Sequence, residues 1–280
     1  MGNGKSKSKP STNHHFYTEQ SINSLDINSA PNNLYAISQN NTIVINREDI
    51  VKRKFNKEKL IAKNTKTCGS AVVVLVHLSS YHKNLFGSGH EDGLIVLWDI
   101  NTFNDFRVLN GHNQSFKIRS LIHSKTNSQE LISCSEDKTI KVWNISNATC
   151  LRTILTTSNI LALEFINKDN LLVSAHAFDF QLYFWDYTKE EANEQIVYSL
   201  PGHLNNIWCL LYIPETNYLL SGSEDCTIIL WDLTHKTYIR TYDEHSSLIT
   251  SLMLAEGNRF ISARSEEHTS ELQSRSAISY

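Results

Sequence analysis

Hydrophobic and polar positions alternate along this chain in short runs that polar turns separate. In the clearest instance an apolar pair, Leu131-Ile132, leads through small residues to an aspartate, and a second run then alternates apolar and polar residues until Trp143. A period of two residues is typical of β-strands, and clusters of Gly, Asn, Asp and Ser between such runs indicate tight turns. The pattern therefore predicts pairs of antiparallel strands joined at the aspartate.

This strand–turn–strand pattern repeats. Four copies align on their final tryptophans, at successive steps of 45, 42 and 46 residues: Trp98, Trp143, Trp185 and Trp231. An aspartate stands six residues before each of them: Asp92, Asp137, Asp179 and Asp225. Further apolar runs before and after each copy bring the number of expected strands to about four in each period of about 40 to 45 residues, which is typical of a propeller blade. We therefore predict an all-β fold, a β-propeller of four-stranded blades.

The repeats resemble the WD-repeat family. Gly111-His112 and Gly202-His203 match the Gly-His half of its motif, and Glu244-His245 is a variant of it. The resemblance implies that a loop histidine, a strand serine, the turn aspartate and the tryptophan form a hydrogen-bonded tetrad inside a blade. Two tetrads are implied in this way: His112, Ser133, Asp137 and Trp143, and His203, Ser221, Asp225 and Trp231.

Two repeats depart from the family pattern. Cys68 and Thr156 stand where the loop histidines of the Asp92–Trp98 and Asp179–Trp185 repeats are expected. We expect these two blades to be less rigid than the others. The sequence offers no partner for His176, which lies near the third turn.

The repeat pattern weakens toward both ends of the chain. A degenerate first unit covers 34–46, with Asn40 in place of the aspartate, and a last unit begins near 247 and stops after Ala263. Residues 264–280 resemble the translation of a DNA sequencing-library adapter, and we interpret them as a non-biological tail; a genuine polar tail is the alternative. We expect a propeller over 21–263 with about five and a half blades, and hence a truncated, incomplete ring.

The N-terminus carries a lipidation motif. Met1-Gly2-Asn3-Gly4-Lys5-Ser6 fits the pattern for N-myristoylation of Gly2. A single myristoyl chain binds membranes only weakly, and a basic patch is the usual second signal. Lys5, Lys7 and Lys9 supply such a patch, so we predict that residues 1–20 form a flexible basic leader that anchors the protein to an anionic membrane surface. A solvated leader without function is the alternative.

Composition narrows the function classes further. The net charge of −3 gives no reason to expect a nucleic-acid partner. No apolar run reaches the roughly 18 residues of a membrane helix. The N-terminus has no apolar core of a secretory signal, and the five cysteines form no Cys-x-x-Cys pair. These observations favour a cytoplasmic protein, located at the cytoplasmic face of a membrane if Gly2 is lipidated.

No motif for chemistry accompanies the repeats. The sequence has no phosphate-binding loop, no metal-ligand spacing and no nucleophile elbow. We therefore predict no catalytic residues, no metal, no cofactor and no small-molecule substrate. The predicted function is a non-enzymatic scaffold or adaptor that binds a protein or peptide on a face of the propeller. A substrate receptor of a ubiquitin ligase and a G-protein-β-like signalling subunit are the alternatives, although neither an extra helical module nor a heptad segment precedes the blades.

Overall fold

The structure is a computed structural model. It describes residues 34–39, 42–47, 64–67, 273–277 and most of 69–265, the exceptions there being 79, 83, 100–101, 103, 167, 190–194 and 256–258. The side chains of 34–67 and 273–277 are not described. The predictions for Gly2, Lys5, Lys7, Lys9 and Cys68 lie outside the described residues. In the part of the chain described, no helix is both long and apolar enough to span a membrane.

The strands in the described part of the chain form six antiparallel sheets. The first comprises β1 (Leu34–Gln39), β2 (Thr42–Arg47) and β3 (Asn64–Thr67). The second comprises β4 (Val72–His77), β5 (Leu85–His90), β6 (Ile95–Asp99) and β7 (Asp105–Leu109). The third comprises β8 (Ile118–His123), β9 (Glu130–Ser135), β10 (Thr139–Asn144) and β11 (Thr149–Leu155).

The remaining sheets follow the same order. The fourth comprises β12 (Ile160–Ile166), β13 (Leu171–His176), β14 (Gln181–Trp185) and β15 (Ile196–Pro201). The fifth comprises β16 (Ile207–Ile213), β17 (Tyr218–Ser223), β18 (Ile228–Asp232) and β19 (Thr237–Tyr242). The sixth comprises β20 (Ile249–Ala255), β21 (Arg259–Arg264) and β22 (Gln273–Ala277).

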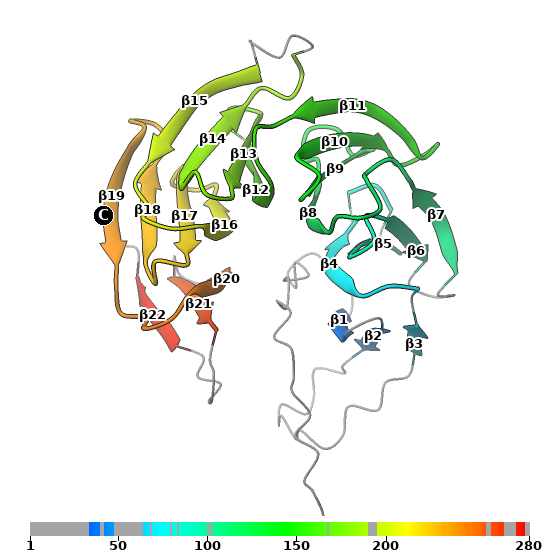
Figure 1. Cartoon of the computed structure of the whole chain (residues 1–280). Helices are drawn as coiled ribbons and strands as arrows, with labels where there is room; N and C mark the ends of the chain where they lie inside the picture. Colours follow the sequence, from blue (N-terminus) through cyan, green and yellow to red (C-terminus); the bar gives the residue numbers. More distant parts are fainter. Residues whose placement is uncertain are drawn as a thin grey trace, which may run out of the picture.

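The sheets are arranged as blades around a centre. In Figure 1 the first strands β4, β8, β12 and β16 lie innermost, and the fourth strands β7, β11, β15 and β19 lie on the outside. The ring is open between the sheet of β20–β22 and the sheet of β1–β3 (Figure 1). The all-β propeller of four-stranded blades and its open ring are therefore confirmed.

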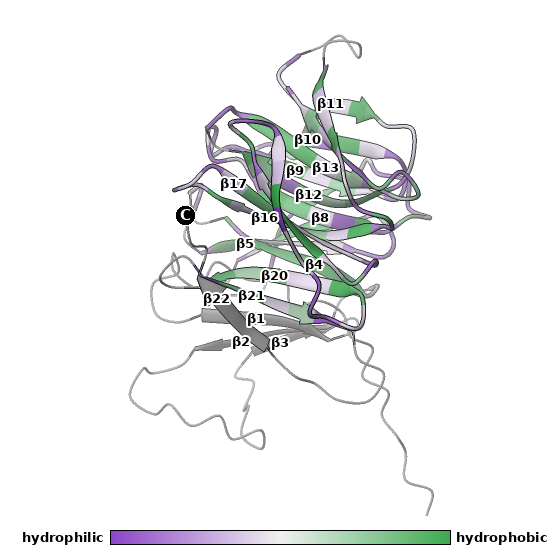
Figure 2. Ribbon diagram, turned by 90° about the vertical axis from the view of Figure 1, so that its left-hand side faces the viewer, coloured by the Kyte–Doolittle hydropathy of each residue, from purple (hydrophilic) through white to green (hydrophobic). Residues whose placement is uncertain are grey.

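The hydrophobic core lies between the blades. Buried residues of one blade cluster with those of the next: Val173 and Phe184 of the fourth sheet, for example, belong to one cluster with Leu219 and Trp231 of the fifth. Figure 2 shows the hydrophobic residues concentrated in the strands and the hydrophilic ones mainly in the loops. Since a blade alone leaves such a face exposed, stacking on its neighbour is what stabilises it.

The sixth sheet extends into the segment interpreted as a tail. β22 pairs antiparallel with β21, and Ser262 lies opposite Gln273. The repeat pattern ends at Ala263, yet residues beyond it complete a third strand. This pairing concerns the backbone only, and the adapter origin of 264–280 stays a prediction from the sequence.

Candidate functional site

One edge of the ring carries the turn aspartates and the loop histidines of the predicted site. We call this edge the turn face: it consists of the turns between the second and third strands of each blade and the loops that join successive blades. Backbone hydrogen bonds tie each turn to the adjoining loop, as from Glu136 N to Lys117 O at 3.1 Å and from Glu224 N to Asn206 O at 2.8 Å. Each turn is therefore joined through its backbone to the loop beside it.

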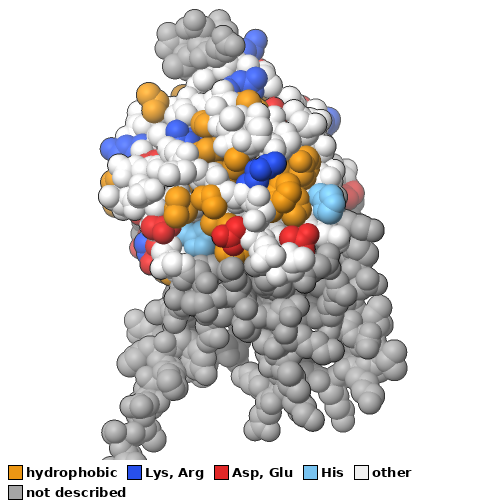
Figure 3. All heavy atoms as spheres, turned by 90° about the vertical axis from the view of Figure 1, so that its right-hand side faces the viewer, with side chains coloured by type: hydrophobic (Ala, Val, Ile, Leu, Met, Phe, Trp, Pro, Cys, Tyr) orange, Lys and Arg blue, Asp and Glu red, His pale blue; other side chains and the backbone are white. Residues whose placement is uncertain are grey.

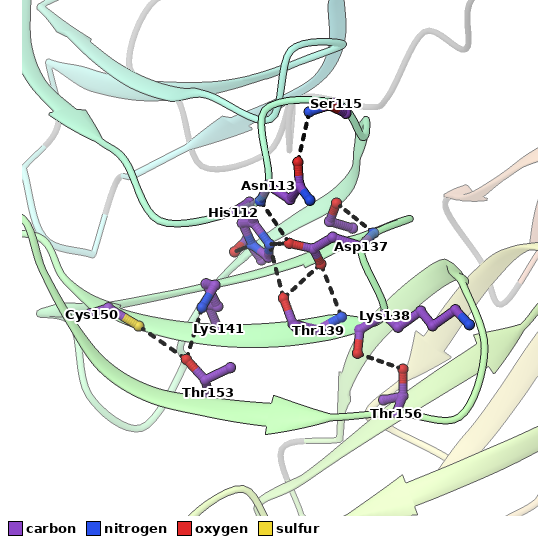
Figure 4. Close-up of polar contacts among 12 residues, drawn as sticks. His112, Asn113, Ser115, Asp137, Lys138, Thr139, Lys141, Cys150, Thr153 and Thr156 are labelled. Atoms are coloured by element: carbon purple, nitrogen blue, oxygen red, sulfur yellow. Dashed lines mark hydrogen bonds and ion pairs between the residues drawn. The ribbon is translucent and has the colours of Figure 1, made fainter.

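Beneath the turn face, the first implied tetrad is assembled. Trp143 Nε1 lies 2.8 Å from Ser133 Oγ, which lies 2.6 Å from His112 Nε2. His112 Nδ1 lies 2.8 Å from Asp137 Oδ2 (Figure 4). The donors follow in one direction: the indole N–H donates to Ser133, the Ser133 hydroxyl to His112, and the other imidazole N–H to Asp137. The network links the buried strand core to the exposed turn.

The second tetrad repeats this geometry. Trp231 Nε1 is 2.8 Å from Ser221 Oγ, and Ser221 Oγ is 2.7 Å from His203 Nε2. His203 Nδ1 is 2.9 Å from Asp225 Oδ2. Asp225 also accepts hydrogen bonds from the Leu204 backbone N–H and the Thr227 hydroxyl. The carboxylate therefore fixes both the turn and the loop that carries Leu204.

The turn aspartates of the two tetrads, Asp137 and Asp225, are held ionised. Burial alone would raise the pKa of Asp137, but hydrogen bonds from His112 and Thr139 outweigh burial and hold this pKa well below its usual range. Burial would likewise raise the pKa of Asp225, but hydrogen bonds from His203 and Thr227 lower this pKa below its usual range. Both carboxylates therefore accept hydrogen bonds over the whole neutral range of pH.

The contacts Ser133–His112–Asp137 have the order of a hydrolytic triad, with a serine, a general base and an orienting carboxylate. Ser133 is completely buried, however, and its Oγ accepts the indole N–H of Trp143. A nucleophile needs access to its substrate, and this hydroxyl has none. The arrangement is suited to holding a blade together.

In the two complete blades without a loop histidine, a histidine on the strand that carries the serine bonds that serine instead. Ser88 Oγ is 2.8 Å from His90 Nε2 and 2.7 Å from Trp98 Nε1. Ser174 Oγ is 2.8 Å from His176 Nε2 and 2.7 Å from Trp185 Nε1. The interpretation that His176 has no partner is therefore wrong. A histidine two residues after the serine, on the same strand, occupies the place of the loop histidine.

Sequence reasoning missed these two strand histidines although their signal was present. The motifs Ser88-Gly89-His90 and Ser174-Ala175-His176 occur just where the loop histidine is absent, whereas the two tetrad blades have serine at this position, namely Ser135 and Ser223. The turn aspartates of these blades make other contacts: Asp92 accepts the Leu94 backbone N–H, and Asp179 accepts the hydroxyl of Tyr183.

We predict that His176 makes the protein sensitive to mild acid. Burial lowers the pKa of His176 from 6.5 to about 4. Between these values the unfolded chain takes up a proton that the folded chain excludes, so stability falls as the pH drops below about 6.5. His90 is shifted in the same direction, also chiefly by burial. Urea midpoints measured from pH 7 to pH 4.5 should fall less steeply in His176→Gln than in wild type. Parallel curves for the two proteins would contradict this assignment.

The glycines of Gly111-His112 and Gly202-His203 make room for a tryptophan ring. A Cβ on Gly202 would lie 2.6 Å from Cη2 of Trp231, and one on Gly111 would lie 2.9 Å from Cη2 of Trp143. We predict that Gly202→Ala lowers the free energy of unfolding by about 1–3 kcal/mol, the usual cost of overpacking. Gly69→Ala is the matched control, since a Cβ there meets no atom within 4 Å. Equal urea midpoints for the two variants would refute the packing role.

Large hydrophobic side chains are exposed on the turn face. Among the described residues, Leu204, Phe178 and Leu155 are the most exposed of the large hydrophobic side chains, at 84%, 82% and 77%. Leu204 and Phe178 lie in a loop and a turn of this face, and Leu155 is the last residue of β11, where that strand enters the loop to β12. Most of the others, at lower exposure, lie on the outer strands, with Phe116 in the loop before β8 and Leu254 on β20 as the exceptions. Figure 3 shows hydrophobic side chains on the side of the ring where β7 and β11 lie. Isolated surface hydrophobics are common, but the most exposed ones gather at one edge here.

The turn face is acidic. Its described loops and strand ends carry nine carboxylates: Glu91, Asp92, Glu136, Asp137, Asp179, Glu224, Asp225, Asp243 and Glu244. They carry four cations: Lys117, Arg119, Lys138 and Arg264. Lys117 pairs with Glu91, and Arg119 pairs with Glu136. Arg119 also lies over the ring of Trp208, 5.5 Å from its centroid.

Nothing in the described part of the chain forms a metal site: no three His, Cys, Asp or Glu residues there gather as ligands would. Burial raises the pKa of the Cys134 thiol to about 12, so this cysteine is no ready nucleophile. Burial also raises the pKa of Glu164, on the inner strand β12, to about 7. The chemistry of the turn face is instead that of a surface, with apolar side chains beside carboxylates.

Comparison with known proteins agrees with this architecture. The model of the family described as WD domain, G-beta repeat matches residues 103–144 and 194–232. Each match covers the outer strand of one blade and the first three strands of the next, so the sequence repeat is offset from the structural blade.

The chain matches only part of the length of each individual relative. The chain is 31% identical to Protein ROOT INITIATION DEFECTIVE 3 of Arabidopsis thaliana over 170 residues, which is 56% of this chain and 38% of that protein. It is 28% identical to Nuclear distribution protein PAC1 of Komagataella phaffii over 158 residues, 51% of this chain and 31% of the relative. Protein SPA1-RELATED 3 of Arabidopsis thaliana is 23% identical over 194 residues, 67% of this chain and 22% of its own. The matched region is thus well under half of each relative.

Proposed function

Because this chain is a WD-repeat protein, we propose that it is a non-enzymatic scaffold that binds a protein partner on its turn face. WD-repeat proteins are generally interaction scaffolds. The observation that carries the proposal is the gathering of Leu155, Phe178 and Leu204, the most exposed large hydrophobic side chains described, on that one edge. Exposed apolar clusters of this kind are typical of interaction surfaces.

The networks beneath the turn face support the same function. In the two tetrad blades, buried hydrogen bonds run from the tryptophan to the turn aspartate, as from Trp231 to Asp225. A surface held rigid before binding loses less conformational entropy when a partner binds. The scaffold thus presents pre-organised turns rather than flexible ones.

The experiment is affinity capture of the full chain from its own cells, with partners quantified by mass spectrometry. The variant Phe178→Asn/Leu204→Ser should lose the main partner. The control variant Tyr238→Ser/Ile239→Ser alters exposed side chains on the outer strand β19 and should keep it. Loss of the partner in both variants, or in neither, would contradict the turn face as the binding surface.

We propose further that the leader tethers the scaffold to the cytoplasmic face of a membrane. The support is the sequence alone: the acceptor motif at Gly2, followed by Lys5, Lys7 and Lys9. Each lysine near an anionic surface would add about 1 kcal/mol. Fractionation should find the wild type with membranes and Gly2→Ala in the soluble fraction. Equal membrane association of the two would exclude a lipid anchor.

The two alternatives from the sequence, a ubiquitin-ligase substrate receptor and a G-protein-β-like subunit, are narrower versions of the same scaffold. Each would engage its partner through the turn face in our proposal. The identity of the partner captured by the wild type and lost in Phe178→Asn/Leu204→Ser distinguishes them.

A further inference from the structure

Phe178 departs from its counterparts in the other blades. It stands immediately before the turn aspartate, where the three other complete blades have Glu91, Glu136 and Glu224. Its backbone φ is 65°, in the left-handed region, and none of the three glutamates has a positive φ. This conformation is unfavourable for a bulky L-residue.

Packing does not compensate for this strain. The side chain of Phe178 is 82% exposed, so burial contributes little to holding it in place. Its backbone N–H donates to Asn206 Oδ1 at 2.8 Å, which fixes the turn but would serve any residue at this position. A strained residue whose side chain contributes nothing to the fold points to a role outside the fold.

Asn206 joins Phe178 to two further residues of the turn face. Its side-chain Nδ2 donates to Glu224 Oε2 at 3.0 Å. Leu204, two residues before it in the same loop, is 84% exposed and is fixed by its backbone N–H to Asp225. Asn206 therefore links the backbone of Phe178 in one blade to Glu224 in the next, and the loop that carries Asn206 also carries Leu204. We call Phe178, Leu204 and Glu224 the anchor patch.

The charge beside the anchor patch is not balanced. Glu91 and Glu136 each pair with a cation, whereas within the described part of the chain no cation pairs with Glu224 or with Asp179. The patch thus combines two exposed apolar side chains with one carboxylate, Glu224, and Asp179 beside Phe178 adds a second carboxylate; neither is paired with a described cation. It is also part of a face on which carboxylates outnumber cations.

We propose that the anchor patch binds a basic segment of a partner protein in which an apolar side chain is flanked by lysine or arginine. The apolar side chain would cover Phe178 and Leu204, and the cation would pair with Glu224. Apolar burial supplies affinity and opposite charge supplies orientation and selectivity. This inference rests on the proposed scaffold function and specifies the chemistry of its partner.

The test uses three synthetic peptides and the purified full chain at low ionic strength, with binding followed by fluorescence polarisation. The first peptide carries leucine flanked by lysines and arginines, the second the same leucine flanked by glutamates, and the third serine in place of leucine among the basic residues. We expect the first to bind at least about tenfold more tightly than either other, the size of effect expected from one strong interface residue. Equal or reversed preference would overturn the proposal.

Three variants localise the site. Phe178→Asn and Glu224→Lys should each weaken binding of the first peptide by about tenfold or more, whereas Tyr238→Ser on β19 should leave it unchanged. Asparagine tolerates the left-handed conformation, so the Tm of Phe178→Asn should stay the same or rise. This separates lost binding from lost folding. If the captured partner depends on the turn face while no peptide preference appears, the scaffold function stands and this inference fails.

Discussion

Trp231→Ala is expected to lower the free energy of unfolding by about 4 kcal/mol, the usual cost of removing a large buried aromatic side chain. Trp231 is only 2% exposed and packs in a cluster with residues of the preceding blade, including Val173 and Phe184. The substitution opens a cavity between two blades and also leaves Ser221 without its indole donor. Urea unfolding followed by far-ultraviolet circular dichroism measures the loss.

Trp208→Ala is the matched control for this prediction. Trp208 lies on the inner strand β16, is partly exposed and stacks on Arg119 rather than filling a core between blades. We expect Trp208→Ala to lower the free energy of unfolding by no more than half as much as Trp231→Ala does. Equal losses for the two tryptophans would mean that the core between blades does not dominate the stability of the ring.

Ser133→Ala is expected to lower the free energy of unfolding by about 3 kcal/mol. This one substitution removes the hydrogen-bond partner of two buried groups, and each buried group left without a partner costs about 1–3 kcal/mol. Ser133 Oγ accepts the indole N–H of Trp143 and bonds His112 Nε2. Ser174→Ala should cost a similar amount, since Ser174 Oγ bonds both Trp185 and His176.

Ser135→Ala provides the control on the same strand. Ser135 is as buried as Ser133, but its hydroxyl serves mainly the backbone N–H of Asp137, so we expect a loss of about 1 kcal/mol. A negligible loss for Ser174→Ala beside a large one for Ser133→Ala would show that a strand histidine does not replace the loop histidine energetically.

The fold could be predicted from the sequence because its signal is periodic. The spacing of Trp98, Trp143, Trp185 and Trp231 sets the blade length, and alternation of apolar residues sets the strands. The tetrad residues of two blades could be named because His112 and His203 follow a glycine at a fixed place in the repeat. The structure brings each of these histidines to its serine and its aspartate.

Other features depend on three-dimensional placement. His176 reaches Ser174 because both point from the same face of β13, two residues apart, which the loop-based motif does not include. The sequence does not indicate the left-handed φ of Phe178, because positions with this backbone conformation are usually occupied by glycine or asparagine and not by phenylalanine. The anchor patch itself joins Phe178 to Glu224 through Asn206 of the next blade, a contact between residues far apart in the chain.

The most direct test of the scaffold is site-specific photocrosslinking of the full chain in its own cells. Benzoylphenylalanine replaces Leu204 on the turn face in one sample and His235, between β18 and β19 on the opposite edge, in another; both side chains are well exposed. We expect a protein adduct of defined mass from position 204 and none from position 235. Adducts only at position 235, or the same adducts at both positions, would contradict partner binding on the turn face.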